Sequence, residues 1–383
     1  MISEEIMKIL NVNMSLDPIN GGGTAERTFQ MSRFLSGDAH VCTILTLDIG
    51  LTRERMEGMA GVKVIALPCL VERFYLPKFS YSAIQKIVDN SDIIHLMGHW
   101  TFLNALVFFF ARQKKKPYVV CPAGALPIFG RSRLLKHLYN ALVGYALIRG
   151  ADRCVSVTEL EKEQFASYGV LPKRISIIPN GIDIVSVPDK LNGARERLGL
   201  PIRPFFLFLG RLNPIKGPDI LLDAYAQLRN SPYDLVFVGP DGGLLQTLQE
   251  KCIKYGIADR VHFPGPLYGN DKYQAYYAAS ALVIPSRKEA MSIVAVEAGA
   301  TGTPVLLTKE CGFDEVEKCG GGFVVPPTVE GLKNGLEALT RRESELVKMG
   351  VALKTHVIKN YSWESIAQIY RRMYGEILIS HHN

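Results

Sequence analysis

The chain has 383 residues, 48% of them hydrophobic and 21% charged. One hydrophobic core seldom serves more than about 300 residues, so two domains are expected, and a disordered or low-complexity protein is excluded. The net charge of +7 favours anionic ligands or an anionic surface. No zinc-finger spacing, arginine-rich arm or aromatic RNA-binding motif supports nucleic acid as a partner.

The seven cysteines are scattered and include no C-x-x-C pair, which predicts neither a disulfide framework nor a zinc cage. The N-terminus lacks the basic and apolar regions of a signal peptide. The longest apolar run, Ala105–Ala111, is much shorter than the roughly 20 residues that cross a bilayer and is expected to be a core helix. We therefore expect a cytoplasmic protein.

A strand at Ile6–Asn13 is expected to open the chain, followed by a glycine loop and a helix over Ala25–Leu35. Such a loop lets backbone amides approach a phosphate or a sugar closely; the alternative is a flexible turn. A dinucleotide fingerprint fits only in part: Glu26 stands where the third glycine belongs, although Asp48 ends the next strand where a ribose-binding acid is expected. The candidate ligand residues in the loop are Gly21, Gly22 and Gly23.

Two histidines are expected near the end of a later strand. Strands at Val41–Leu47 and Val62–Leu67 precede a strand and loop over Ser91–Trp100, which contains His95 and His99. Open α/β sheets bind ligands at the carboxyl ends of their strands, so both imidazoles are candidates for a role toward the substrate. The alternative is a buried histidine bonded to the backbone.

A basic and apolar helix is expected over residues 130–142, after a strand at Tyr118–Pro122. This pattern indicates a solvated basic face over an ordinary core; the alternative hypothesis is loose docking to an anionic membrane face. Lys114–Lys116 adds a second basic cluster in the same domain. The helix carries Arg131, Arg133, Lys136 and His137 beside Leu134, Leu135 and Leu138.

A turn at Pro179–Asp183 is the expected domain boundary, because the alternation of strands and helices starts again after it. The strand Phe205–Gly210 leads into a loop with Arg211 and Lys216, and a helix is expected over Asp219–Leu228. Two cations between a strand end and a helix N-terminus predict a clamp for a diphosphate. The alternative is a pair of solvated loop charges.

The stretch Pro285–Gly299 joins a buried strand at Ser280–Pro285 to a helix that Ser292 is expected to cap. Glu289 precedes this helix and Glu297 lies in its second turn, so both carboxylates can reach one ligand. The alternative is a capped helix with solvated acids. The unpaired amides expected to face an anion there are those of Ser292, Ile293 and Val294.

Further strands are expected at Asp234–Val238, Val261–Phe263 and Pro304–Leu307, with a last one in the glycine-rich segment 319–326. Two successive alternations predict an α/β protein with two Rossmann-like domains facing a cleft. The predicted domains are residues 1–182 with a C-terminal helix, 364–383, and residues 183–363. The apolar stripe expected on that helix comprises Ile366, Ile369, Tyr370, Met373 and Ile377.

Taken together, these motifs resemble the retaining glycosyltransferases of the GT-B fold, in particular those of family 4. Glu289 and Glu297 resemble the paired-glutamate motif of that family, and Gly210–Gly217 resembles its diphosphate-binding stretch. Pro179–Asp183 is similar to the linker, and Tyr361–Trp363 to the start of the helix that returns to the first domain. The N-terminal half resembles the family more loosely.

The sequence departs from the family pattern at three positions. Ala290 follows the first glutamate where glycine is usual, which restricts the backbone. Met97 stands where a second histidine is often found after His95. Ala123 stands where His or Arg commonly precedes a glycine, so a sugar contact or a cation is missing.

The resemblance implies transfer of a sugar from a nucleotide-diphosphate donor, with UDP-sugars favoured, to an acceptor hydroxyl with retention of configuration. Arg211, Lys216 and the helix amides would stabilise the leaving diphosphate without a metal. Glu297 would bind the ribose and Glu289 the donor sugar. Gly239, which follows the strand Asp234–Val238, is included in the nucleotide site.

The first domain is then expected to bind the acceptor, a sugar or a lipid-linked glycan in polysaccharide or glycolipid assembly. No metal and no cofactor besides the nucleotide sugar is expected. The alternatives are an NAD-dependent oxidoreductase and a two-lobed, non-catalytic ligand-binding protein.

Overall fold

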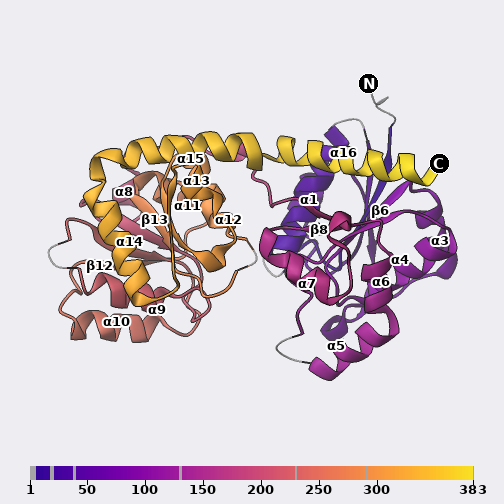
Figure 1. The fold of residues 1–383 in the computed structure, drawn as a ribbon, viewed down its shortest axis with the longest axis horizontal. Coiled ribbons are helices and arrows are strands. Elements are labelled where there is room, and N and C mark those ends of the chain that lie inside the picture. The colour runs from indigo at the N-terminus through magenta and orange to yellow at the C-terminus, as the bar shows by residue number, and fades with distance from the viewer. Residues whose placement is uncertain are drawn as a thin grey trace. The chain divides into compact units, whose positions relative to one another are not determined.

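The computed structural model describes residues 6–17, 21–37, 40–128, 132–228, 231–289 and 291–382. The chain forms two compact units (Figure 1). Unit 1 comprises the chain up to Gly181 and again from Trp363 onward, and unit 2 comprises Ile182–Ser362. The chain passes from unit 1 to unit 2 after Gly181 and returns to unit 1 at Trp363. We call these two places the crossings; each lies one residue before the position expected from the sequence. Arg131 and Ala290, which the sequence singled out, lie outside the described residues.

Unit 1 is built on a parallel sheet in the order β3-β2-β1-β6-β7-β8-β9. The central strands are apolar and buried, as in sheets covered on both faces. The strand order reverses between β1 and β6, and ligands bind beyond the carboxyl ends of strands at such a point. The strands are β1 (Lys8–Val12), β2 (Val41–Leu47), β3 (Lys63–Leu67), β6 (Ile93–Met97), β7 (Tyr118–Cys121), β8 (Arg153–Ser156) and β9 (Ile175–Ile177), with β4 (Cys69–Val71) and β5 (Leu76–Pro77) in a separate antiparallel pair.

The helices of unit 1 connect these strands, and two of them were not predicted from the sequence, α2 (Arg53–Glu57) and α3 (Tyr81–Asp89). A turn of π-helix at Asn140–Gly144 joins α5 to α6, so the chain is helical without a break from Arg133 to Gly150. The remaining helices are α1 (Gly22–Gly37), α4 (Phe102–Gln113), α5 (Arg133–Tyr139), α6 (Tyr145–Gly150), α7 (Lys162–Ser167) and α16 (Trp363–His382).

Unit 2 is built on a second parallel sheet, in the order β12-β11-β10-β13-β14-β15. Its strand order reverses between β10 and β13. The strands are β10 (Phe205–Leu209), β11 (Asp234–Val238), β12 (Val261–Gly265), β13 (Ala281–Ile284), β14 (Val305–Thr308) and β15 (Gly322–Val325). The helices are α8 (Ala194–Arg197), α9 (Pro218–Tyr225), α10 (Leu245–Lys254), α11 (Gly269–Ala278), α12 (Ile293–Thr301), α13 (Glu315–Lys318), α14 (Val329–Arg341) and α15 (Leu346–Tyr361).

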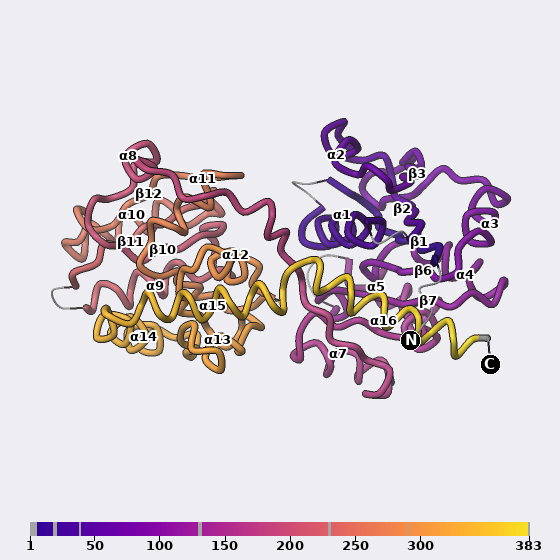
Figure 2. The backbone as a smooth tube through the Cα atoms, turned by 90° about the horizontal axis from the view of Figure 1, so that it is seen from above, coloured from indigo at the N-terminus to yellow at the C-terminus, as the bar shows by residue number. Residues whose placement is uncertain are grey.

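The last helix, α16, belongs to unit 1, as expected, and is drawn in yellow in Figures 1 and 2. The apolar stripe expected on it is largely confirmed, because Ile366, Tyr370, Met373 and Ile377 are buried. Ile369 was wrongly included: it is 38% exposed, and Tyr374 is buried in its place. Four residues after Tyr370, this tyrosine continues the buried stripe of a 3.6-residue period.

The prediction of two Rossmann-like α/β domains is confirmed. Most predicted strands agree with the observed ones to within one or two residues. Among the described residues, none of the helices is long and apolar enough to cross a membrane.

Candidate functional site

The predicted site residues of unit 2 gather at the switch point of its sheet. One loop, residues 210–217, follows β10, and another, described at residues 285–289 and 291–292, follows β13. Gly239, at the end of β11, lets the neighbouring backbone pass closely, because a Cβ there would lie 1.9 Å from the Gly210 carbonyl oxygen. The candidate residues that follow neighbouring strands therefore converge on one edge of the sheet, where ligands of open α/β sheets bind.

These two loops are fastened to each other. Gly217 has a φ of 70°, and a Cβ at this position would lie 2.1 Å from the Pro285 carbonyl oxygen. The Arg287 amide donates to the Ile215 carbonyl oxygen at 2.8 Å. Its guanidinium donates hydrogen bonds to both carboxylate oxygens of Asp219, at 2.8 and 2.7 Å. A bidentate pair of this kind fixes geometry as well as adding energy, so the loop after β10 is held in place from the loop after β13.

Lys216 and Glu289, predicted as separate ligand residues, contact each other. The Lys216 ammonium donates to Oε1 of Glu289 at 2.6 Å. The glutamate side chain is only 11% exposed. Its other oxygen, Oε2, is buried and has no hydrogen-bond partner among the described residues. A buried carboxylate oxygen without a donor is costly, so the site is set to accept a further hydrogen bond.

Arg211, the other predicted cation, lies exposed immediately beyond Gly210. Among the described residues, its guanidinium makes neither a hydrogen bond nor an ion pair. An unpaired guanidinium at the end of a central strand is available to an anion and can hold two oxygens at once.

The helix predicted after Ser292 begins at Ile293, as expected, but Ser292 does not cap it in the expected way. Its hydroxyl makes no capping hydrogen bond. Its amide, expected to be free, donates to the Cys311 carbonyl oxygen at 2.9 Å, so that part of the prediction is wrong. Hydrogen bonds from the Ile293 and Val294 amides are absent among the described residues, which leaves these two for an anion.

Two buried hydroxyl groups add to the unsatisfied oxygen of Glu289. Oγ of Ser286 and Oγ of Ser292 have no hydrogen-bond partner within the described parts of the chain. Three orphaned polar atoms within seven residues are unusual, because buried polar groups are nearly always paired. All three belong to the segment that follows β13, next to the switch point of the sheet.

Glu297, in the second turn of α12, is held by two groups from α11. Lys272 donates to Oε1 at 2.6 Å, and the hydroxyl of Tyr276 donates to Oε2 at 2.8 Å. Burial and the charge of this carboxylate raise the pKa of Tyr276 well above its usual value, so the phenol stays protonated and donates. Neither partner was predicted, because helix α11 was not expected from the sequence.

In unit 1 the glycine segment is placed differently from the prediction. Gly21 precedes α1, whereas Gly22 and Gly23 are its first two residues, so the expected loop of three glycines is shorter. The helix therefore begins three residues before Ala25. The segment still follows β1, which borders the switch point of its sheet. Asn20, the residue before the glycines, lies outside the described chain.

The two predicted histidines occupy different positions. His95 lies in the middle of β6 rather than at its carboxyl end, and its Nδ1 lies 2.6 Å from the Tyr374 hydroxyl of α16. Burial and the nearby charge of Arg27 lower the pKa of His95 to about 3. His99 does follow the strand, and burial lowers its pKa to about 4. Both imidazoles are therefore neutral near pH 7.

His99 is held in one tautomer by Asn140. Nε2 of His99 lies 3.0 Å from Oδ1 of Asn140, whose Nδ2 donates to the Tyr168 hydroxyl at 2.7 Å. Because an amide oxygen only accepts, Nε2 carries the proton and Nδ1 is left as an acceptor. That Nδ1 atom is buried and unpartnered among the described residues. A donor from a ligand would satisfy it.

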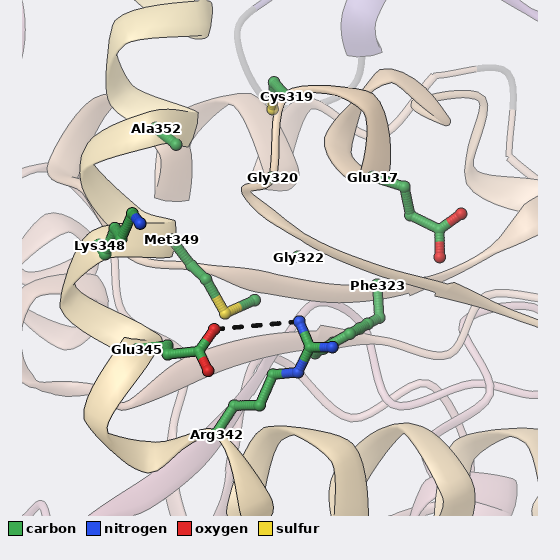
Figure 3. Close-up of a pocket in the computed structure, with 10 residues that line it drawn as sticks. All are labelled: Glu317, Cys319, Gly320, Gly322, Phe323, Arg342, Glu345, Lys348, Met349 and Ala352. Carbon is green, nitrogen blue, oxygen red and sulfur yellow. Dashed lines mark ion pairs between the residues drawn. The ribbon is translucent and has the colours of Figure 1, made fainter.

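Other features of unit 2 lie away from the switch point. A cavity of about 400 Å³ is lined by residues of α13, β15 and α15, with Arg342 and Glu345 4.0 Å apart (Figure 3). It contains none of the predicted site residues. In the part of the chain that the structure describes, no group of three or more His, Cys, Asp or Glu side chains is placed to hold a metal ion.

The sequence is similar to known proteins in both halves. The family model described as Glycosyltransferase Family 4 matches residues 21–186, and the model described as Glycosyl transferases group 1 matches residues 194–367. A D-inositol 3-phosphate glycosyltransferase of Catenulispora acidiphila is 38% identical over 199 residues, 49% of this chain and 47% of that protein. Another, of Nocardia farcinica, is 34% identical over 249 residues, 62% of this chain and 55% of that protein. The chain thus spans about half the length of these relatives.

Solved structures share the fold over nearly the whole chain. Anabaena Alr3699/HepE in complex with UDP superposes with a TM-score of 0.77 at 20% identity, covering 97% of this chain and 100% of that one. A glycosyltransferase of Rickettsia africae gives a TM-score of 0.77 at 19% identity, covering 98% and 99% of the two chains. With the two family models and these folds in agreement, the chain belongs to the family 4 glycosyltransferases and has the GT-B fold.

Proposed function

We propose that this protein transfers a sugar from a nucleotide-diphosphate donor, with UDP-sugars favoured, to an acceptor hydroxyl with retention of configuration. The observation that carries the proposal is the clustering at one switch point of an unpaired arginine, the Lys216–Glu289 pair and orphaned buried oxygens. Such a set of cations and acceptors is suited to a ligand that has both phosphates and hydroxyl groups.

The chemistry follows from where charge develops. When the bond between the sugar and the diphosphate breaks, negative charge grows on the leaving oxygen. Arg211, Lys216 and the amides of Ile293 and Val294 stabilise that charge. Hydroxyl groups of the donor sugar supply the hydrogen bond that Oε2 of Glu289 lacks. The leaving phosphate takes the proton of the acceptor from the same face, so the configuration is retained and no general base is required of the protein.

Glu297 binds the two ribose hydroxyls of the donor. Its carboxylate accepts from Lys272 and Tyr276 through one lone pair on each oxygen, and each oxygen keeps capacity for a second donor. The Anabaena neighbour was solved with UDP, which supports uracil as the base.

The acceptor is a sugar or a lipid-linked glycan bound by unit 1, in polysaccharide or glycolipid assembly. His99 is the group there with a free acceptor nitrogen, Nδ1, at the end of a central strand. The curated relatives are named for D-inositol 3-phosphate, so this compound belongs in any acceptor screen.

Ligand binding tests the donor class. Saturation-transfer NMR with UDP-, GDP- and ADP-sugars and NAD should give signals for a nucleotide sugar, strongest for a UDP-sugar, and none for NAD. Arg211→Ala should weaken UDP by about 1.5–3 kcal/mol and leave uridine unchanged, because it removes a diphosphate contact. Equal losses for UDP and uridine would refute the diphosphate assignment, and a signal from NAD alone would favour an oxidoreductase.

Metal independence is part of the proposal, because the cations and helix amides meet the charge of the diphosphate. Transfer assays with and without EDTA test it. Activity is expected to persist with EDTA, and a strict requirement for added Mg²⁺ or Mn²⁺ would contradict it.

A further inference from the structure

The helical segment from Arg133 to Gly150 in unit 1 carries apolar side chains on its solvent face. Leu134 is 85% exposed and Leu142 is 75% exposed, and Leu135, Leu138 and Tyr145 are also exposed. At about 100° per residue, Leu134, Leu135 and Leu138 of α5 fall within roughly 100° of arc around the helix. Leu142 lies in the π-helical turn and Tyr145 at the start of α6, which continue the same segment. We call the set Leu134, Leu135, Leu138, Leu142 and Tyr145 the leucine face. In Figure 1, α5 lies at the lower edge of unit 1.

The opposite side of the same segment already serves the core. Asn140 and Leu147 are buried, and Tyr139 donates its hydroxyl to the Thr101 carbonyl oxygen at 3.1 Å. The helix is thus apolar on both sides, although only one side is covered. A helix that is hydrophobic all round is normally buried, so the leucine face calls for a partner.

Charge identifies that partner. Between Asp92 and Asp152 the chain contains no aspartate or glutamate, but it contains eight lysines and arginines. Arg133 and His137 are exposed on the turns that carry the leucine face, and Lys136 lies 5.6 Å from the centroid of the Trp100 ring. A second copy of this chain would bring like charges together, whereas an anionic lipid surface complements them.

Not every basic residue nearby contributes. Lys114 pairs with the Asp89 carboxylate at 3.1 Å, and Lys116 donates to the carbonyl oxygens of Asp89 and Ser91. They precede the start of β7, whereas α5 follows the end of that strand. The sequence had placed this cluster in the same domain as the helix; the structure places it at the opposite end of the strands, where Lys114 and Lys116 bind groups of unit 1 itself.

We propose that unit 1 docks on an anionic bilayer through the leucine face, with the leucines entering the interface and the basic side chains contacting lipid headgroups. Interfacial helices combine an apolar face with flanking lysines and arginines in this way. The proposal concerns the place where the protein works and does not depend on the reaction of unit 2.

Vesicle co-sedimentation tests the proposal with the full chain. Vesicles of phosphatidylcholine mixed with phosphatidylglycerol should bind the protein, and vesicles of phosphatidylcholine alone should bind it much less. The triple variant Leu134→Gln, Leu138→Gln and Leu142→Gln should lose at least about tenfold in vesicle affinity. Arg133→Gln should lose about fivefold at low salt and little at high salt.

A matched control separates the leucine face from exposed apolar residues in general. Ile202, Ile253 and Val347 of unit 2 are 94%, 73% and 80% exposed, and their triple replacement by glutamine should leave vesicle binding unchanged. Since all the replaced side chains are exposed, circular dichroism and thermal melting should show both triple variants folded. A tryptophan introduced as Leu138→Trp should be quenched by brominated lipid if the face enters the bilayer.

Three results would overturn the proposal. The first is no binding to anionic vesicles at low salt. The second is binding that both triple variants retain equally. The third is a concentration-dependent dimer, seen by analytical ultracentrifugation without vesicles and abolished by the leucine triple variant, which would assign the face to a second copy of this chain.

Discussion

Glu297 shows how a single carboxylate is prepared for a ligand. Its two oxygens are fixed separately by Lys272 and by Tyr276, so the side chain cannot rotate without breaking a hydrogen bond. The tyrosine is fully buried, and its hydroxyl makes this hydrogen bond to the carboxylate. In the proposed site Tyr276 is therefore a positioning residue, because it would act on the nucleotide only through the glutamate.

Removal of the Tyr276 hydroxyl should weaken the binding of the ribose. We expect Tyr276→Phe to weaken UDP by about 1–2 kcal/mol, because a carboxylate oxygen loses its donor. The preference for UDP over 2′-deoxy-UDP should shrink in the same variant, as measured by calorimetric titration. Tyr225→Phe is the matched control, since that buried hydroxyl donates to the Tyr233 carbonyl oxygen at 2.8 Å. An unchanged preference in Tyr276→Phe would show that Glu297 does not contact the ribose.

His99 gives unit 1 a dependence on pH. Burial lowers its pKa to about 4, whereas an unfolded histidine titrates near 6.5. Between these values the unfolded chain binds a proton that the folded chain does not, so the free energy of unfolding decreases as the pH falls from about 6.5 to 4. The loss from this one group amounts to about 3 kcal/mol.

The two tryptophans, Trp100 and Trp363, both belong to unit 1, so their fluorescence reports its unfolding separately from that of unit 2. In urea titrations, stability should fall between pH 7 and pH 4.5. His99→Asn should make this fall smaller, and the part that remains is due to His95, whose pKa burial also lowers. His137→Gln, which removes an exposed imidazole, is the control and should leave it unchanged. The same slope in wild type and His99→Asn would contradict the assignment.

At the scale of elements, the loops after β10 and β13 act as one piece because Arg287 joins them. This arginine was not among the predicted site residues, but it binds Asp219 and the loop backbone beside Lys216. It fixes the position from which Lys216 reaches Glu289. The proposed diphosphate site thus depends on an ion pair that lies outside it.

Arg287→Met should release the loop after β10. We expect UDP to bind about five- to tenfold more weakly, or roughly 1–1.4 kcal/mol, while uridine is unaffected, because the loop supplies the phosphate contacts. The control is Arg260→Met, which breaks a 2.6 Å pair with Asp234 at the other edge of the same sheet. Equal losses in the two variants would mean that both act through the general stability of unit 2.

The strands of both sheets were predictable from the sequence because each is a short, buried apolar run bounded by glycine, proline or polar residues. Helices α2 and α3 were missed since they are short, and their exposed faces leave too little apolar periodicity to detect. The pairing of Lys216 with Glu289 was also beyond reach, because it joins residues 73 positions apart. Spacing along the chain locates candidate residues but does not show which of them touch.

The amide of Ser292 illustrates a second limit. A serine before a helix predicts a capping hydroxyl, and most often correctly. Here the segment Lys309–Cys311 passes close by and takes the amide, while the hydroxyl remains unpaired. Tertiary contacts of this kind override local propensity, and here they do so within the candidate site.

At the scale of the whole molecule, one buried arginine holds the two places where the chain leaves and re-enters unit 1. Arg27 of α1 donates to the carbonyl oxygens of Ile178 and Pro179 at 2.7 and 2.9 Å, and to Oδ1 of Asn180 at 2.7 Å. It also donates to the hydroxyl of Tyr370 in α16. The outgoing segment and the returning helix are therefore anchored by one guanidinium.

Arg27→Met should cost about 3–5 kcal/mol of unit 1 stability, because several buried acceptors lose their donor at once. Arg27→Lys keeps the charge but cannot reach all acceptors, so its loss should be smaller. Urea unfolding followed by tryptophan fluorescence measures both. Limited proteolysis should cut the methionine variant near residues 178–183. If Arg27→Met were as stable as the wild type, the hydrogen bonds of Arg27 would not be what anchors the two crossings.

The two crossings also lie side by side within the fold. The Ile182 amide, at the start of unit 2, donates to the Tyr361 carbonyl oxygen at its end, at 2.7 Å. On the other side, Gly181 packs so closely on Trp363 that a Cβ would lie 2.8 Å from the indole ring. Unit 2 is thus a domain inserted into the chain of unit 1, and its two ends lie next to each other. Unit 2 can therefore be exchanged for another domain whose two ends lie equally close together, without any change in the path of the unit 1 chain. For the same reason, a circular permutant of unit 2 with its original ends joined should keep its fold.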